Sequence, residues 1–257
     1  MSRGERIHKF LSRAGLGSRR EIERWVREGR VRVNGEVAAL GQPVTPADQI
    51  QVDGRRIAMR VAAEVPCQVL IYRKPSGQIV TRSDPQGRET VFANLPRPGR
   101  GRWVAVGRLD VATSGVLAFT TDGELAQRLM RPEYRIPRQY SVRVFGQVTE
   151  AQLKALRSGV ELDDGMARFD ALEIGGATGD NQWFHVTVHE GRNRLVRRLW
   201  ESQGLQVSRL IRTRFGPLVA DKSIRAGGSR LATGEEVQAL RELVGLKGPD
   251  TKPTKPR

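Results

Sequence analysis

The chain has 257 residues, a formal net charge of +16 and a pI of about 11.2. This length allows one large hydrophobic core or two smaller ones. Its basic residues are 37 arginines and 7 lysines. Arginine pairs with phosphate in a bidentate manner and stacks on bases, so the composition predicts a polyanionic partner, most simply nucleic acid or an anionic membrane.

Several classes of protein are excluded by what the sequence lacks. No apolar run approaches eighteen residues, and the N-terminal segment has neither the apolar core nor the cleavage site of a secretory signal. We therefore expect a cytoplasmic, monomeric protein with no membrane partner. The only cysteine, Cys67, is predicted to be a buried strand thiol. No zinc-ligand spacing, P-loop or strand-linked glycine motif is present, which predicts no metal and no small-molecule cofactor.

Residues 1–61 predict a compact basic module. Apolar residues at helical spacing indicate a short helix over 6–11 and a second helix that begins at Ser18 and ends at Gly29. Glu21 stands three residues after Ser18, which is the spacing of a capping box. Two strand-and-turn units follow, at 31–35 and 50–54.

A larger unit is predicted over 67–245, after a linker over 61–66 and before a disordered basic tail over 246–257. Its strands are predicted at 68–72, 103–106, 116–119, 140–144 and 183–189. Helices are expected after three capping pairs, namely Thr121 with Glu124, Thr149 with Gln152, and Thr233 with Glu236. Many strands with dispersed helices predict an α+β fold with a mostly antiparallel sheet.

The polar turn at 107–115 holds the residue that is best suited to chemistry. Asp110 follows an arginine and precedes a Thr-Ser-Gly run and an apolar strand. A carboxylate presented from a tight loop can act as a nucleophile or a base. An aspartate in such a turn also commonly bonds its own backbone, and the local pattern leaves both interpretations open.

A second feature is the basic run between Gly191 and Arg214, which contains seven arginines and one glutamate. In a helix that begins at Asn193, Arg194 and Arg198 lie four residues apart and repel each other. Such a helix is predicted to need an anion, for which RNA phosphate is the obvious candidate. Arg209, Arg212 and Arg214 are predicted to continue this basic stripe on the next strand.

These motifs resemble the active-site region of RNA pseudouridine synthases, in the branch that carries an S4 domain and modifies ribosomal RNA. The resemblance rests on the segments 107–115, 119–123, 138–140 and 190–200, and it favours the group that acts on the large subunit. It implies a small N-terminal S4 RNA-binding domain and a catalytic domain with a mixed, mostly antiparallel sheet and a central cleft. No cofactor is implied, because the product is an isomer of the substrate.

The resemblance also implies roles for individual residues. Asp110 is the expected catalytic carboxylate, Tyr140 is expected to stack on the target uracil, and Arg197 is expected to pair with the aspartate. Arg108, Leu109 and Val196 are expected to line the substrate pocket. Further residues are expected to bind RNA: Lys9, Arg13, Ser18, Arg19, Arg20, Arg24, Arg27, Arg192, Arg194, Arg198, Arg209 and Arg212.

The expected partner is ribosomal RNA of the large subunit or an assembly intermediate. One alternative is a non-catalytic RNA-binding or ribosome-assembly protein, which would not need Asp110, Tyr140 and Arg197 together. Another is an enzyme of the same family that acts on small-subunit RNA or on another ribosomal site. A hydrolase that uses Ser114 is disfavoured, because the serine is not in a Gly-x-Ser-x-Gly elbow.

Overall fold

The computed structural model describes residues 4–57, 65–219 and 223–246. The chain divides into two compact units, which are described separately. The first comprises residues 1–68, 96–104 and 120–123, and the second comprises residues 69–95, 105–119 and 124–257. Most of the predicted linker over 61–66 and of the predicted tail over 246–257 lies outside the described residues.

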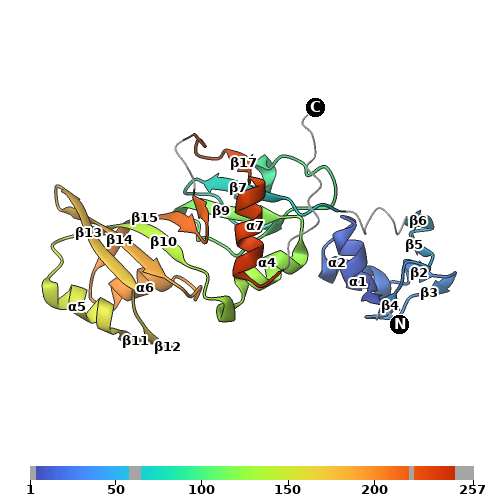
Figure 1. Cartoon of the computed structure of the whole chain (residues 1–257), viewed down its shortest axis with the longest axis horizontal. Helices are drawn as coiled ribbons and strands as arrows, with labels where there is room; N and C mark the ends of the chain where they lie inside the picture. Colours follow the sequence, from blue (N-terminus) through green and yellow to red (C-terminus); the bar gives the residue numbers. More distant parts are fainter. Residues whose placement is uncertain (1–3, 58–64, 220–222, 247–257) are drawn as a thin grey trace. The chain divides into compact units, whose positions relative to one another are not determined.

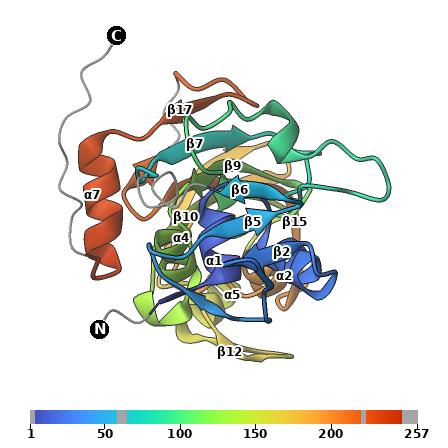
Figure 2. The same cartoon turned by 90° about the vertical axis from the view of Figure 1, so that its right-hand side faces the viewer.

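The first unit packs two helices against a small sheet (Figures 1 and 2). Its four-stranded sheet is antiparallel in the order β3-β2-β5-β6, and β1 pairs with β4. Ile7, Phe10 and Ile22 of the helices share a core with Val31 and Ile50 of the strands. The elements are α1 (Ile7–Arg13), α2 (Arg19–Arg27), β1 (Glu5–Arg6), β2 (Val31–Val33), β3 (Glu36–Val37), β4 (Pro43–Val44), β5 (Ile50–Val52) and β6 (Arg55–Ile57).

The local signals of this unit are confirmed. The Ser18 hydroxyl accepts from the Glu21 amide, and the Glu21 carboxylate accepts from the Ser18 amide, which completes the capping box. The two predicted turns have positive φ at both central residues, with 52° and 90° in the first and 49° and 76° in the second. This backbone matches the twist of a tight hairpin, and asparagine, aspartate and glycine tolerate it best.

The second unit is built on a nine-stranded sheet in the order β13-β14-β10-β15-β9-β7-β17, with β16 beside β15 and β8 beside β9. Most of its pairs are antiparallel, whereas β15 and β9 are parallel. The predicted class is thus confirmed. The strands are β7 (Val69–Lys74), β8 (Val104–Ala105), β9 (Thr113–Thr120), β10 (Arg138–Phe145), β13 (Ala171–Thr178), β14 (Asn181–Val188), β15 (Gln206–Phe215), β16 (Leu218–Val219) and β17 (Ser229–Leu231).

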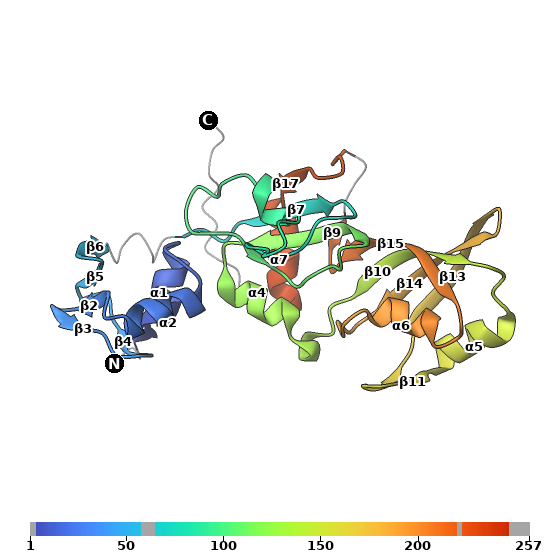
Figure 3. The same cartoon turned by 180° about the vertical axis from the view of Figure 1, so that it is seen from behind.

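Helices and a small hairpin complete the second unit. Two helices, α5 and α6, lie on one side of β10 and β14 (Figure 3). Trp200 of α6 contacts Phe184 of β14, with ring centroids 4.7 Å apart. Arg128 of α4 donates to the Val244 carbonyl at the end of α7. The elements are η1 (Val91–Asn94), α4 (Gly123–Met130), η2 (Pro132–Tyr134), α5 (Glu150–Ser158), β11 (Val160–Leu162), β12 (Gly165–Ala167), α6 (Leu195–Glu201) and α7 (Gly234–Leu243).

Three local predictions were wrong. Thr121 is not the cap of α4, because its hydroxyl donates to the Pro66 carbonyl and the helix begins after Asp122. Cys67 is half-buried and precedes β7, with its Sγ 4.0 Å from the Thr120 hydroxyl. The helix predicted from Asn193 begins at Leu195, because Arg194 has a left-handed φ of 50°.

Of the remaining predictions, one is confirmed in full and one in part. The capping boxes of α5 and α7 are confirmed. The strand predicted at 103–106 is only two residues long. Over the described ranges, no helix has the length and apolar character that a membrane span requires.

Candidate active site

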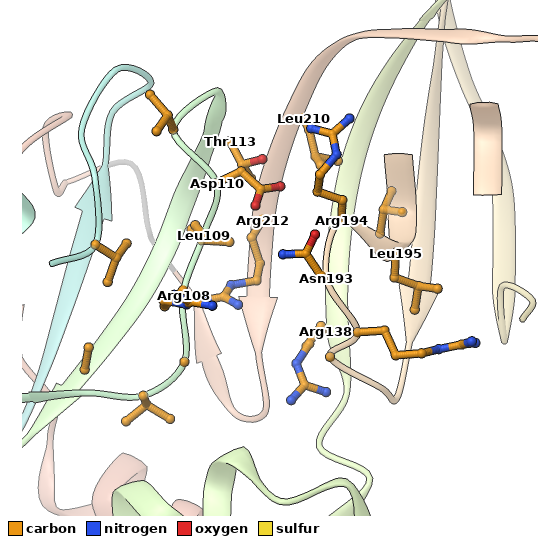
Figure 4. Close-up of a pocket in the computed structure, with 18 of the residues that line it drawn as sticks. Arg108, Leu109, Asp110, Thr113, Arg138, Asn193, Arg194, Leu195, Leu210 and Arg212 are labelled. Atoms are coloured by element: carbon orange, nitrogen blue, oxygen red, sulfur yellow. The ribbon is translucent and has the colours of Figure 1, made fainter. Parts of the chain in front are cut away.

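A half-open cleft of about 1240 Å³ lies in the second unit. One wall is the loop at 105–113, and the facing wall is the segment at 188–196 (Figure 4). Side chains from β10 and β15 also line it, namely Arg138, Tyr140, Leu210, Arg212 and Phe215. The cleft therefore collects residues that are distant in sequence, from the Gly-Arg-Leu-Asp turn to the arginine-rich run.

Asp110 lies in the loop that leads into β9. Its carbonyl accepts from the Thr113 amide at 3.0 Å, which closes the turn. Two residues further, Gly115 has φ of +109° and is paired with Arg212 in the parallel ladder. A Cβ at position 115 would lie 2.1 Å from the Arg212 carbonyl oxygen. Glycine is therefore required here, since only it allows β9 to approach β15 so closely.

Lys74 stabilises this loop through hydrogen bonds to its main chain. Its side chain has no exposed surface, and its Nζ donates to the carbonyls of Asp110, Val111 and Thr113 at 3.1, 3.3 and 2.9 Å. Burial lowers the pKa of Lys74 to about 8, while the charge of Asp110 opposes that change. Lys74 was not predicted to be a functional residue. Its signal in the sequence is a lysine at the end of an apolar strand, directly before proline.

Arg197 is also buried and acts on the same loop. Its guanidinium donates to the Val207 carbonyl at 3.0 Å and to the Ala112 carbonyl at 3.4 Å. Burial and then the charge of Arg194 lower the pKa of Arg197, and the charge of Asp110 opposes them. The expected pair with Asp110 is thus electrostatic, and the contact of Arg197 is with the main chain of the loop.

The other expected pocket residues line the cleft. Arg108 is exposed, Leu109 is buried, and both belong to the same loop as Asp110. Tyr140 comes from β10 and is 9% exposed, and Val196 is buried on α6. Sequence reasoning did not single out Asn193, which faces Asp110 from the opposite wall (Figure 4).

The arginine-rich segment has its own counter-ions, whereas RNA phosphate had been the expected source of the anion that this segment needs. Asp164, in the β11–β12 turn, accepts from the Nη1 and Nη2 atoms of Arg198 at 2.9 and 2.8 Å and from Arg192 at 2.9 Å. Arg194 precedes the helix and pairs with Glu201 at 3.0 Å. The predicted repulsion between Arg194 and Arg198 is therefore offset by internal carboxylates.

Arg209 and Arg212 do not form one exposed stripe. Arg209 is exposed on β15, whereas Arg212 is only 3% exposed and lines the cleft. The ladder between β10 and β15 shifts register between Arg143 and Val144 and again between Gln139 and Tyr140. Neither shift falls between Arg209 and Arg212, so the ordinary alternation of β15 places these residues, which are three apart, on opposite faces of the strand. The predicted stripe disregarded this alternation.

The family model described as RNA pseudouridylate synthase matches residues 68–202, which include both walls of the cleft, and the S4 domain model matches residues 5–50. The chain belongs to the RNA pseudouridylate synthase family. It is thus an enzyme of the isomerase class, and the non-catalytic alternative is set aside.

Named relatives of this synthase are similar over most of its length. The chain is 56% identical over 95% of its length to "Ribosomal large subunit pseudouridine synthase B" of Pasteurella multocida and covers 71% of that protein. It is 53% identical over 94% of its length to the protein of the same name from Escherichia coli K12 and covers 84% of it. A "pseudouridylate synthase" crystal structure aligns with 92% of this chain and 100% of its own, with a TM-score of 0.63 and 24% identity, and supports the fold.

The S4 segment of the synthase presents arginines on one helix. Four of them are exposed along α2, at Arg19, Arg20, Arg24 and Arg27. Lys9 and Arg13 both pair with Glu5, and the Ser18 hydroxyl is used by the capping box. Arg24 also pairs with Glu28 at 3.7 Å, so Arg19, Arg20 and Arg27 are the groups that are most available to a phosphate backbone.

The contacts of the synthase give the Ser114 hydrolase no support. His185 bonds the Ser141 hydroxyl, His189 pairs with Asp170, and His8 lies near Glu23. Within the described ranges, no three histidine, cysteine, aspartate or glutamate residues form a group that could hold a metal ion.

Proposed function

We propose that this synthase isomerises one uridine of large-subunit ribosomal RNA to pseudouridine, with Asp110 as the catalytic carboxylate. The placement of Asp110 carries the proposal. Its side chain lines the cleft while the buried cations Lys74 and Arg197 bind the carbonyls of its loop. The large-subunit substrate is supported by the names of relatives that are 53–56% identical.

The reaction breaks the bond between N1 of uracil and C1′ of the sugar and forms a bond from C5 to C1′. The proton of C5 leaves, and N1 gains a proton, so atoms balance without an external reactant. Asp110 either attacks the sugar, removes a proton from C2′, or attacks the base. In each case a carboxylate that is oriented by the fixed loop raises the rate through positioning.

The substrate nucleotide has to leave its stack to reach the cleft, as in other enzymes that act on a base. In the proposal Tyr140 stacks on the uracil and Val196 packs beneath it, since both line the cleft. Arg108 is an exposed residue of the loop and fills the vacated space or holds a phosphate. The exposed arginines of α2, together with Arg192, Arg194, Arg198 and Arg209, bind the RNA backbone. We further propose that the synthase acts as a monomer in the cytoplasm, on ribosomal RNA or on an assembly intermediate.

The test is pseudouridine mapping on transcripts of both ribosomal RNAs incubated with the wild-type protein, without added metal or cofactor. Asp110→Asn removes the carboxylate with little change of shape. Asp180→Asn makes the same change at an exposed turn outside the cleft.

We expect one new pseudouridine in the large-subunit transcript with the wild type and with Asp180→Asn, and at least a 10³-fold lower rate with Asp110→Asn. Pseudouridine in the small-subunit transcript instead would show that the substrate is small-subunit ribosomal RNA and not the proposed large-subunit RNA. An active Asp110→Asn would refute the role of the carboxylate.

A further inference from the structure

Two guanidinium groups meet at a single ring on the floor of the cleft. The guanidinium carbon of Arg212 lies 5.1 Å from the centroid of the Phe215 ring, and that of Arg138 lies 5.5 Å from the same centroid. All three residues line the cleft. They come from the adjacent strands β10 and β15, in which Arg138 is the register partner of Phe215.

Arg212 is anchored but incompletely bonded. Its Nε donates to the Val116 carbonyl at 2.8 Å, whereas its buried Nη2 has no hydrogen-bond partner in the described part of the chain. The Thr113 hydroxyl, which also lines the cleft, is likewise buried without a partner there. Buried donors of this kind are normally satisfied, so an unpaired one on a cleft wall indicates a place for a ligand.

The charges at this point favour an anionic ligand. The Arg138 guanidinium has its pKa lowered chiefly by burial, and the charge of Arg212 adds to the effect. The acid whose charge acts on Arg138 is Glu190, but its two carboxylate oxygens already accept from Arg192 at 2.8 and 2.9 Å. Two cations held close together in a poorly solvated site repel strongly. A neutral uracil carbonyl would accept one hydrogen bond but would leave this repulsion in place.

We propose that Arg138 and Arg212 form a phosphate subsite that binds one of the two phosphates flanking the target uridine. The inference rests on the proposed function, since it concerns the same cleft. Arg212 extends from β15 beside Asp110 (Figure 4). Its backbone pairs with Gly115 of β9, the strand that follows Asp110 in the sequence. A phosphate held here places the adjoining ribose next to the carboxylate. Arg138 and Arg212 are thus substrate-binding residues that set the register of the RNA strand.

The first experiment needs no known target site. Binding of uridine 3′,5′-bisphosphate and of uridine is measured by titration of the full chain, for the wild type, Arg212→Gln and Arg138→Gln. Arg157→Gln removes one exposed charge from α5, outside the cleft, and is the matched control.

We expect the bisphosphate to bind the wild type and Arg157→Gln at least tenfold more tightly than uridine. This preference should fall at least fivefold in each cleft variant. An unchanged preference in both cleft variants would overturn the subsite. Arg138→Gln keeps the bond between Arg212 and Val116, so it remains informative if Arg212→Gln fails to fold.

The second experiment uses the RNA stem-loop that contains the mapped uridine, with a neutral methylphosphonate in place of either flanking phosphate. On one of the two RNAs, wild-type kcat/KM should fall roughly tenfold or more. Arg212→Gln should show the same loss on unmodified RNA and less than a threefold further loss on the modified RNA.

The inference is overturned if, at both phosphate positions, the loss from Arg212→Gln and the loss from the methylphosphonate multiply in full. Arg212 would then contact the base or support the protein structure instead of binding a phosphate. The two proposals fail separately. A wild type that makes no pseudouridine in unmodified RNA refutes the proposed function, while the bisphosphate titration still decides the subsite.

Discussion

The ammonium group of Lys74 donates to the main-chain carbonyl of Asp110 at 3.1 Å, from a side chain with no exposed surface. Because Val111 and Thr113 also accept from this ammonium, one cation fixes three carbonyls of the loop that presents the carboxylate. Lys74 ends β7, and the loop leads into β9, the neighbour of β7 in the sheet. The position of Asp110 therefore depends on a group that does not line the cleft.

Lys74→Met should impair both stability and turnover. The substitution keeps the apolar stem but leaves the loop carbonyls without their donor, and an unsatisfied buried acceptor costs roughly 1–3 kcal/mol. We expect urea unfolding to show a loss in that range and kcat/KM to fall at least tenfold. Lys154→Met changes an exposed lysine of α5 and should alter neither quantity. If Lys74→Met has the kcat/KM of the wild type, Lys74 does not position Asp110.

The contribution of Lys74 to stability should increase with pH. Its pKa is about 8 in the folded chain and about 10.5 in the unfolded chain, so between these values the unfolded state binds more protons. The free energy of unfolding of the wild type, minus that of Lys74→Met, should therefore rise from pH 8 to pH 10.5. A shift of this size sets an upper limit of about 3 kcal/mol. Chemical denaturation at a series of pH values measures the difference, and a flat difference would contradict the buried ammonium.

Gly115→Ala should strongly destabilise the second unit. The added Cβ would lie 2.1 Å from the Arg212 carbonyl oxygen, at a φ of +109° that other residues rarely adopt. The parallel pair of β9 and β15 would have to separate, so we expect a loss of roughly 3 kcal/mol or more, comparable with the most damaging core substitutions. Gly234→Ala adds the same methyl group in open space at the start of α7 and should be neutral or slightly stabilising. Thermal unfolding of both variants compares them directly.

Asp164→Asn should strengthen RNA binding. The change removes a carboxylate that now holds Arg192 and Arg198, both of which are predicted to bind phosphate. Each additional phosphate contact steepens the plot of log affinity against log salt by about 0.7–0.9. We therefore expect several-fold tighter RNA binding at low salt. The slope of log affinity against log salt should steepen by the amount that corresponds to about one additional phosphate contact. Asp180→Asn is the control for the lost negative charge. Weaker binding by Asp164→Asn would show that the aspartate preorganises these arginines for RNA.

Short-range features could be predicted because their causes are local. The capping box of Ser18 and Glu21 and the Asn34-Gly35 turn each depend on residues within four positions of one another. The motifs around Asp110 and Tyr140 likewise place chemistry-bearing residues on a loop and a strand, where the structure has them. Arg212 was misplaced, because the predicted stripe disregarded strand alternation, which puts Arg209 and Arg212, three residues apart, on opposite faces of β15.

The sequence by itself determined the two modules, the α+β class, the polyanionic character of the partner and the identity of the candidate carboxylate. Each of these follows from composition, periodicity or a contiguous motif. Only the tertiary structure decided which charges face one another. Asp164 neutralises arginines that are 28 and 34 residues away, and Lys74 supports carbonyls up to 39 residues away. Such pairs have no periodic signal, because they form where the sheet and its loops bring distant segments together.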